Sequence, residues 1–166
     1  MDIQNEILPE FEQEMATTRR LLERVPYDKG TWKPHTKSFA LGHLAQLVAW
    51  MPDWVANAAS STEMDLAKAP KYSFETTETL VAMFDRNVSA ARAALSRLKE
   101  SDLNVDWSLK NGSQTFMTMK RNIVIRMHIN HLIHHRGQLS VYLRLVDVPL
   151  PPIYGPTADD RSMVTG

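Results

Sequence analysis

Histidines are the residues of this chain best suited to chemistry, because four of the six fall between positions 128 and 135. His131 and His135 are four residues apart in a segment that is expected to be helical. Their imidazoles would then project from one face of the helix, about one turn apart. Two imidazoles in that arrangement can bind one divalent metal ion. A pair with this spacing is equally typical of a polar stripe on a helix, so it does not define a metal site alone.

A third imidazole would complete the open set of three ligands that catalytic metal sites use. His43 is the single histidine of an apolar helical segment and could supply it from a neighbouring helix. A lone histidine on an apolar helix is more often a core residue, so both interpretations stay open. Known alternatives do not fit. Leu132 occupies the glutamate position of a zincin, and the chain lacks the Glu-x-x-His pairs of a di-iron site.

Other polar residues close to the pair in sequence could assist it. His128 lies three residues before His131 and is a candidate spare ligand or hydrogen-bond partner. Gln138 lies on the same stripe and could orient a ligand or a substrate. Tyr154, in the C-terminal tail, is either a polar lid over the pocket or a plain surface residue. Arg136 points away from the pair and is expected to form a salt bridge at the bundle surface or at a dimer interface.

Apolar periodicity predicts four helices that would position these residues. They are expected at about residues 3–25, 40–59, 76–99 and 120–146. Pro9 falls in the first turn of the first helix or kinks it, and Pro52 predicts a kink or a break in the second. Ser38 is the expected cap of the second helix, and Thr76 or Thr77 that of the third.

The connections complete the predicted fold. Asn111-Gly112 between short alternating flanks is typical of a β-hairpin turn, whereas residues 60–72 form a loop long enough to cross the bundle. Prolines between positions 149 and 156 exclude a helix there, so we expect an irregular, Pro-rich C-terminal tail. The sequence therefore predicts an all-α four-helix bundle, a single domain over residues 1–166, with a short β-hairpin before the last helix.

Composition narrows the class of function. The formal net charge is zero and the basic residues are scattered, so nucleic acid is not an expected partner. The absence of cysteine excludes a disulfide framework, a thiolate zinc site and a cysteine nucleophile. No apolar run is long enough for a membrane span, and the polar, acidic N-terminus is not typical of a signal peptide. We therefore expect a cytoplasmic protein that does not bind membranes.

Assembly is suggested by the aromatic residues. Trp50, Trp54 and Trp107 are candidate exposed aromatic residues, and together with the tandem apolar stripes they suggest a homodimer formed through helix faces. For Trp50 and Trp54, packing is a commoner role than that of a substrate platform.

The block His131-Leu132-Ile133-His134-His135-Arg136-Gly137-Gln138-Leu139 resembles the signature of the DinB family of YfiT-like metalloenzymes. Similar stretches extend the resemblance over nearly the whole chain. They are Trp32-Lys33-Pro34-His35, Lys37-Ser38, Leu41-Gly42-x-Leu44, Leu143-Arg-Leu-Val-Asp-Val-Pro149 and Pro152-Ile153-Tyr154-Gly155-Pro156-Thr157-Ala158-Asp159-Asp160. The resemblance implies a four-helix bundle in up-down-down-up order, commonly a homodimer.

The resemblance also implies a divalent metal (nickel, zinc or iron) held by three histidines. His131 and His135 match the paired ligands of the family. The third ligand of the family comes from the second helix, at a position that is Leu47 here, and His43 lies one helical turn earlier. Characterised relatives act on low-molecular-weight thiols such as bacillithiol or mycothiol.

The expected function is that of a metal-dependent enzyme, a thiol-dependent transferase or a hydrolase. It would act on a small electrophilic substrate through a metal-bound thiolate or water, with His43, His131 and His135 as ligands. The alternative is a metal-free helical module for binding or dimerisation, which the leucine at position 47 favours.

Overall fold

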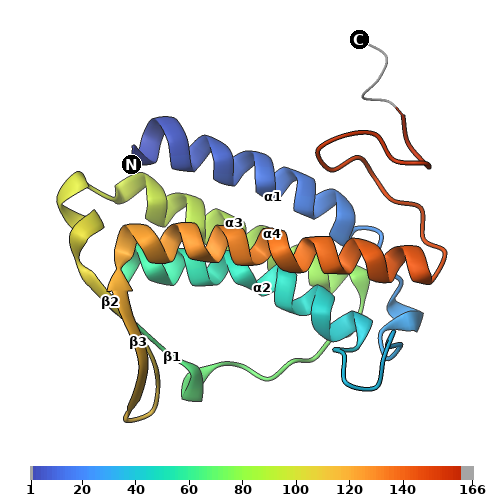
Figure 1. The fold of residues 1–166 in the computed structure, drawn as a ribbon, viewed down its shortest axis with the longest axis horizontal. Coiled ribbons are helices and arrows are strands. Elements are labelled where there is room, and N and C mark those ends of the chain that lie inside the picture. The colour runs from blue at the N-terminus through green and yellow to red at the C-terminus, as the bar shows by residue number, and fades with distance from the viewer. Residues whose placement is uncertain (1, 162–166) are drawn as a thin grey trace.

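The computed structural model describes residues 2–161, in which four long helices pack beside a small sheet (Figure 1). The helices are α1 (Leu8–Leu22), α2 (Leu41–Ser60), α3 (Thr77–Arg97) and α4 (Arg121–Leu145). One turn of π-helix, Ile3–Ile7, leads directly into α1. Short 3-10 turns occupy Tyr27–Lys29, Leu66–Lys68 and Glu100–Asn104. The predicted helical fold is therefore confirmed, with boundaries that differ by a few residues.

Prolines and caps explain several of these boundaries. Pro9 lies in the first turn of α1, where its missing N–H leaves no helical hydrogen bond unmade. α2 continues through Pro52, so of the kink or break expected there the break does not occur, and the kink stays a prediction. The cap predicted at Ser38 is also wrong, because α2 begins after Ala40 without a side-chain cap. Thr76 caps α3 as expected, and its Oγ1 accepts a hydrogen bond from the Thr79 N–H at 3.2 Å.

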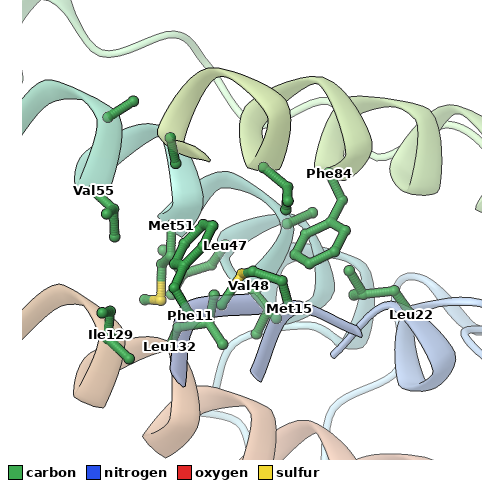
Figure 2. Close-up of a cluster of buried hydrophobic side chains, with 14 of the residues drawn as sticks. Phe11, Met15, Leu22, Leu47, Val48, Met51, Val55, Phe84, Ile129 and Leu132 are labelled. Carbon is green, nitrogen blue, oxygen red and sulfur yellow. The ribbon is translucent and has the colours of Figure 1, made fainter. Parts of the chain in front are cut away.

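The core lies between the four helices. Its buried side chains recur every three or four residues along each helix, which is why the periodicity of the sequence locates them. Figure 2 shows one cluster to which every helix contributes. Its labelled members are Phe11, Met15, Leu22, Leu47, Val48, Met51, Val55, Phe84, Ile129 and Leu132. Burial of each large apolar side chain contributes about 1.5–3 kcal/mol to folding.

Aromatic contacts at both ends fix the relative direction of α2 and α4. Near the end of α2, the ring centroid of Trp54 lies 5.7 Å from those of His128 and His131 in the first half of α4. Just before α2, Trp32 contacts Tyr142 near the end of α4, also at 5.7 Å between centroids. The two helices therefore run antiparallel, side by side, as the ribbon shows (Figure 1). This arrangement places the ends of α2 beside opposite ends of α4.

The predicted hairpin is present and carries a third strand. β2 (Asp106–Asn111) and β3 (Gln114–Lys120) pair antiparallel, and Gly112 takes a positive φ of 58° in their turn, where glycine has no Cβ penalty. β1 (Glu63–Asp65) was not predicted. It forms within the crossover from α2 to α3 and pairs parallel with β2.

Trp107 attaches this sheet to the bundle. Its side chain is fully buried, and its Nε1 donates a hydrogen bond to Oδ1 of Asn57 in α2 at 3.1 Å. The expectation of an exposed Trp107 at a dimer face is therefore wrong. An isolated two-stranded ribbon is marginally stable in water, so this buried indole supplies packing that the hairpin needs.

After α4, residues 146–161 contain no helix or strand. Arg144 forms an ion pair with Asp159, and Asp159 Oδ2 accepts a hydrogen bond from the Leu150 N–H at 2.9 Å. Thr157 Oγ1 donates to the Leu150 carbonyl at 2.8 Å. These contacts hold the segment together against the last turn of α4. Within the described residues, no helix has both the length and the apolar character needed to cross a membrane.

Candidate metal site

His131 and His135 face each other on α4. Their Nε2 atoms are 3.0 Å apart and their ring centroids 4.7 Å apart. Two metal–imidazole bonds of about 2.0–2.1 Å, at an angle between roughly 90 and 110°, place their nitrogens about 2.8–3.4 Å apart. The two nitrogens thus already have the separation that ligands of one metal ion require.

Gln138 sets the tautomer of His135. Its Oε1 lies 2.7 Å from His135 Nδ1 and can only accept, so Nδ1 carries the proton. In the neutral ring, Nε2 of His135 then presents its lone pair towards His131. The amide nitrogen of Gln138 lies 3.1 Å from Nε2 of His134. This support of one ring nitrogen by a hydrogen bond to the other is common among metal-binding histidines.

The electrostatic environment keeps the pair neutral. Burial lowers the pKa of His131, and the neighbouring imidazoles of His135 and His134 lower it further. Burial also lowers the pKa of His135, against the opposing effect of its hydrogen bond to Gln138. The neutral imidazole is the form that binds metals, so these shifts favour metal binding near pH 7.

His43 is not part of this pair. Its ring packs between Phe39 and Tyr72, with centroid distances of 4.5 and 3.9 Å. Leu47, where the resemblance implies a third ligand, is 6% exposed in the core and offers no donor atom (Figure 2). Over residues 2–161, no three histidine, aspartate or glutamate side chains form a group that could hold a metal ion. The structure therefore brings together two of the three expected ligands.

His128 is buried in the core, whereas His131 and His135 are only partly buried. It is 4% exposed, and its ring lies 5.7 Å from the rings of both Trp54 and Trp107 between their centroids. Neither ring nitrogen has a hydrogen-bond partner among the described residues. Burial lowers the pKa of His128 to about 4, so the ring is neutral at pH 7. Its place as a spare ligand stays a prediction.

Arg136 belongs to a buried ion pair that sequence reasoning missed. Its Nη1 lies 2.6 Å from Glu14 Oε2, and both side chains are almost fully buried between α1 and α4. The expectation of a surface salt bridge is therefore wrong. Arg136 lies on the apolar stripe with Leu132 and Leu139, and this position was the signal that it is buried.

Tyr154 closes the buried pair from the C-terminal segment. Its hydroxyl donates to Glu14 Oε1 at 2.9 Å and accepts from Arg136 Nη2 at 2.8 Å. The structure therefore places the tyrosine hydroxyl on the α1 side of α4, at the Arg136–Glu14 pair, while most of its ring stays exposed.

Two cavities lie near the histidine pair. One, of about 480 Å³, is bounded by Phe39 and Lys37 of the loop before α2 and by His135 and Gln138. The other, of about 560 Å³, lies between α2 and the crossover and is lined partly by Trp54, whose ring also contacts His131. The first cavity is lined by His135 itself and so gives small molecules access to the pair, whereas Trp54 separates the second cavity from His131.

This four-helix bundle has the fold of DinB-like proteins. The chain belongs to the DinB family, whose model matches residues 1–162. A DinB-like protein from Bacillus subtilis is 21% identical, with a TM-score of 0.70 over 96% of this chain and 100% of that one. A DinB-like protein from Bacillus cereus is also 21% identical, with a TM-score of 0.69 over 89% and 95% of the two chains. At this identity the likeness establishes the fold. No curated protein matches the chain.

Proposed function

We propose that the chain is a metal-dependent enzyme, a thiol-dependent transferase or a hydrolase, whose metal is held by His131 and His135. The observation that carries this proposal is the 3.0 Å separation of their Nε2 atoms on one helix face. Gln138 supports it by holding the ring of His135 in the tautomer that exposes Nε2. A divalent nickel, zinc or iron ion bound there would lower the pKa of a water or a thiol and so provide a nucleophile near neutral pH.

The fit to the metal is partial. The pair supplies two nitrogens with suitable spacing, whereas Leu47 cannot be a ligand and His43 is packed against Phe39 and Tyr72. His43 as the third ligand requires its ring to leave that packing. We therefore assign the metal to the pair and treat His43 as a prediction with a test of its own.

Metal titration of single variants tests the assignment. We expect unsubstituted protein to bind one equivalent of zinc or nickel by calorimetry, and His131→Ala or His135→Ala to abolish tight binding, because one imidazole cannot chelate. His134→Ala is the matched control and should keep the affinity, since its ring lies outside the pair. A wild-type protein without affinity for either ion would contradict the proposal. An affinity that His43→Ala leaves unchanged would remove only His43 from the ligand set.

The helix order is proposed with the function. Up-down-down-up order is supported by ion pairs whose residue numbers rise together on α1 and α4, Glu10–Arg126 and Glu14–Arg136. Between α1 and α3, residue numbers rise on one helix as they fall on the other, in the ion pairs Glu12–Arg92 and Arg19–Asp85, as expected for antiparallel helices. A low-molecular-weight thiol, a small electrophile and a homodimer complete the proposal, all on the family resemblance.

A second candidate function is that of a metal-free binding or dimerisation module. The buried Leu47 and the packed His43 favour it, because both remove a donor from the family's ligand set. Thermal unfolding separates the two candidates. Added nickel or zinc raises the melting temperature of a protein that binds metal in its folded state, and leaves that of the module unchanged.

A further inference from the structure

A second candidate site lies beside the histidine pair, over the C-terminal half of α2. Trp50, Asp53 and Trp54 share one helix face because their spacing is i, i+3, i+4. The crossover that contains β1 and Tyr72 runs opposite this face, as the green segment next to α2 shows (Figure 1). The cavity of about 560 Å³ lies between these two segments. Tyr72 meets Trp50 edge to face, with ring centroids 5.3 Å apart.

The carboxylates that line this cavity differ in their partners. Glu63 forms an ion pair with Lys110 at 2.6 Å, and Asp65 pairs with Lys68 at 3.9 Å. Asp53 has neither an ion pair nor a hydrogen bond within the described part of the chain. Asp53 is an exposed residue, and its partial burial at the cavity raises its pKa with no neighbouring cation to oppose that effect. The cavity therefore contains one carboxylate that no cation among the described residues pairs with.

The aromatic side chains indicate which kind of ligand would pair with the Asp53 carboxylate. The faces of tryptophan and tyrosine attract an ammonium group that lies within about 6 Å of the ring centroid. Methyl groups on the nitrogen also lose contact with water there, which favours binding through the hydrophobic effect. A hard metal cation requires several converging oxygen ligands, and among the described residues the carboxylates of this cavity do not form a group that could hold one. An anion would meet the unbalanced charge of Asp53. The combination favours an organic cation.

We propose that the cavity formed by Trp50, Asp53, Trp54 and Tyr72 binds a small organic cation with an alkylated ammonium group. The rings surround the alkyl groups and the carboxylate lies opposite the charge. None of the four residues is a proposed metal ligand, so the site can be tested without metal, although Tyr72 packs against His43. Since Trp54 also contacts His131, a bound cation would lie beside the candidate metal site.

Choline and its neutral isostere 3,3-dimethylbutan-1-ol are the probes that separate charge from shape. Binding is measured by calorimetry and by tryptophan fluorescence on the full chain. Excess chelator removes metal ions, so that metal binding at His131 and His135 does not contribute to the signal. We expect saturable choline binding at millimolar concentrations or below, at least about tenfold tighter than binding of the neutral alcohol. Absence of saturable choline binding, or equal binding of both probes, would overturn the proposal.

Variants locate the binding. Asp53→Asn and Trp50→Leu should each weaken choline binding about fivefold or more, whereas Trp50→Phe keeps a ring and should retain most of the affinity. The matched controls are Asp106→Asn, an exposed carboxylate paired with Lys120, and Tyr27→Leu, an exposed ring; both lie outside the cavity. Circular dichroism checks that each variant is folded. Choline affinity that is unchanged in folded Asp53→Asn and Trp50→Leu would place the binding elsewhere and refute the site.

Discussion

The imidazoles of His131 and His135 interact through a single hydrogen bond between their Nε2 atoms. Only one of these two nitrogens can carry a proton in that bond, so His131 is the donor when Gln138 fixes the proton of His135 on Nδ1. A metal ion between the rings takes the place of that proton, which then belongs on Nδ1 of His131, so both rings would bind the metal as neutral imidazoles. Metal binding therefore releases protons, and depends on pH, only where the free imidazoles are protonated.

The first prediction concerns this pH dependence. Burial lowers the pKa of both histidines below the ordinary value, so both stay neutral as the pH falls to about 6.5. Protons then compete with the metal only at lower pH. Zinc affinity measured between pH 8 and pH 5 should stay level at first and fall below about 6.5. An affinity already lost between pH 8 and pH 7 would indicate ligands with raised pKa values.

The second prediction concerns His128. Its folded pKa of about 4 lies below the ordinary value of 6.5, so the folded state favours the neutral ring. This contribution to stability is complete above the unfolded pKa and is lost as the pH falls from about 6.5 to about 4. Each pKa unit corresponds to about 1.4 kcal/mol, which gives a loss of roughly 3 kcal/mol.

Urea unfolding at two pH values measures this loss. The free energy of unfolding of His128→Phe should fall less between pH 7 and pH 4.5 than that of the unsubstituted protein. His35→Gln, at an exposed position, is the control and should follow the unsubstituted protein. Equal losses in all three proteins would mean that His128 does not contribute to the acid sensitivity.

At the scale of elements, α1 and α4 are joined by the buried Arg136–Glu14 pair and by the Tyr154 hydroxyl that bonds to both. Two charges buried in this way are costly unless each is paired. Removing one partner leaves the other charge uncompensated between two helices. The pair therefore makes the packing of α1, α4 and the C-terminal segment interdependent.

The third prediction follows from this interdependence. Arg136→Met should destabilise the protein by about 3–5 kcal/mol in urea unfolding, because the Glu14 carboxylate is left buried and unpaired. Glu14→Gln combined with Arg136→Met should cost less than Arg136→Met alone. Tyr154→Phe removes only hydrogen bonds and should cost about 1 kcal/mol. A double variant less stable than Arg136→Met would show that the charge on Glu14 is not the source of the loss.

The elements differ in how well sequence alone predicts them. Helix periodicity and the Thr76 cap are local signals, so the four long helices and the Asn111-Gly112 turn were predicted correctly. β1 has three residues and forms only by pairing with β2 far along the chain, so no local pattern marks it. Arg136 was assigned to the surface because it is charged, although its position in the periodicity is that of a core residue.

The histidines show the same limit at the candidate site. Spacing within one helix predicts that His131 and His135 meet, and they do. The position of His43 depends on how α2 and the crossover pack. The ring of Tyr72, which comes from the crossover, occupies the space beside His43. A contact between residues on different elements is set by tertiary packing, which the helix pattern does not encode.

At the scale of the whole molecule, apolar side chains remain on the surface near the end of α4. Val141 and Leu145 are each 57% exposed and lie one turn apart on the same face. Phe39, from the loop before α2, is 45% exposed and lines the cavity beside His135 together with Val141. A second copy of the chain would bury these side chains in the homodimer that we propose, and would also cover the cavity beside His135.

The last prediction is that this face forms the dimer. Val141→Glu combined with Leu145→Glu should convert a dimer into a monomer, because two carboxylates would be buried without partners. Light scattering at micromolar concentrations measures the mass, and Ile123→Glu, exposed near the start of α4, is the matched control that should remain a dimer. If the face also controls access to the pair, the monomeric variant should exchange zinc with a chelator faster than the dimer. A monomer mass for the unsubstituted protein over that range would refute the homodimer, while a dimer that survives both substitutions would place its interface on another face.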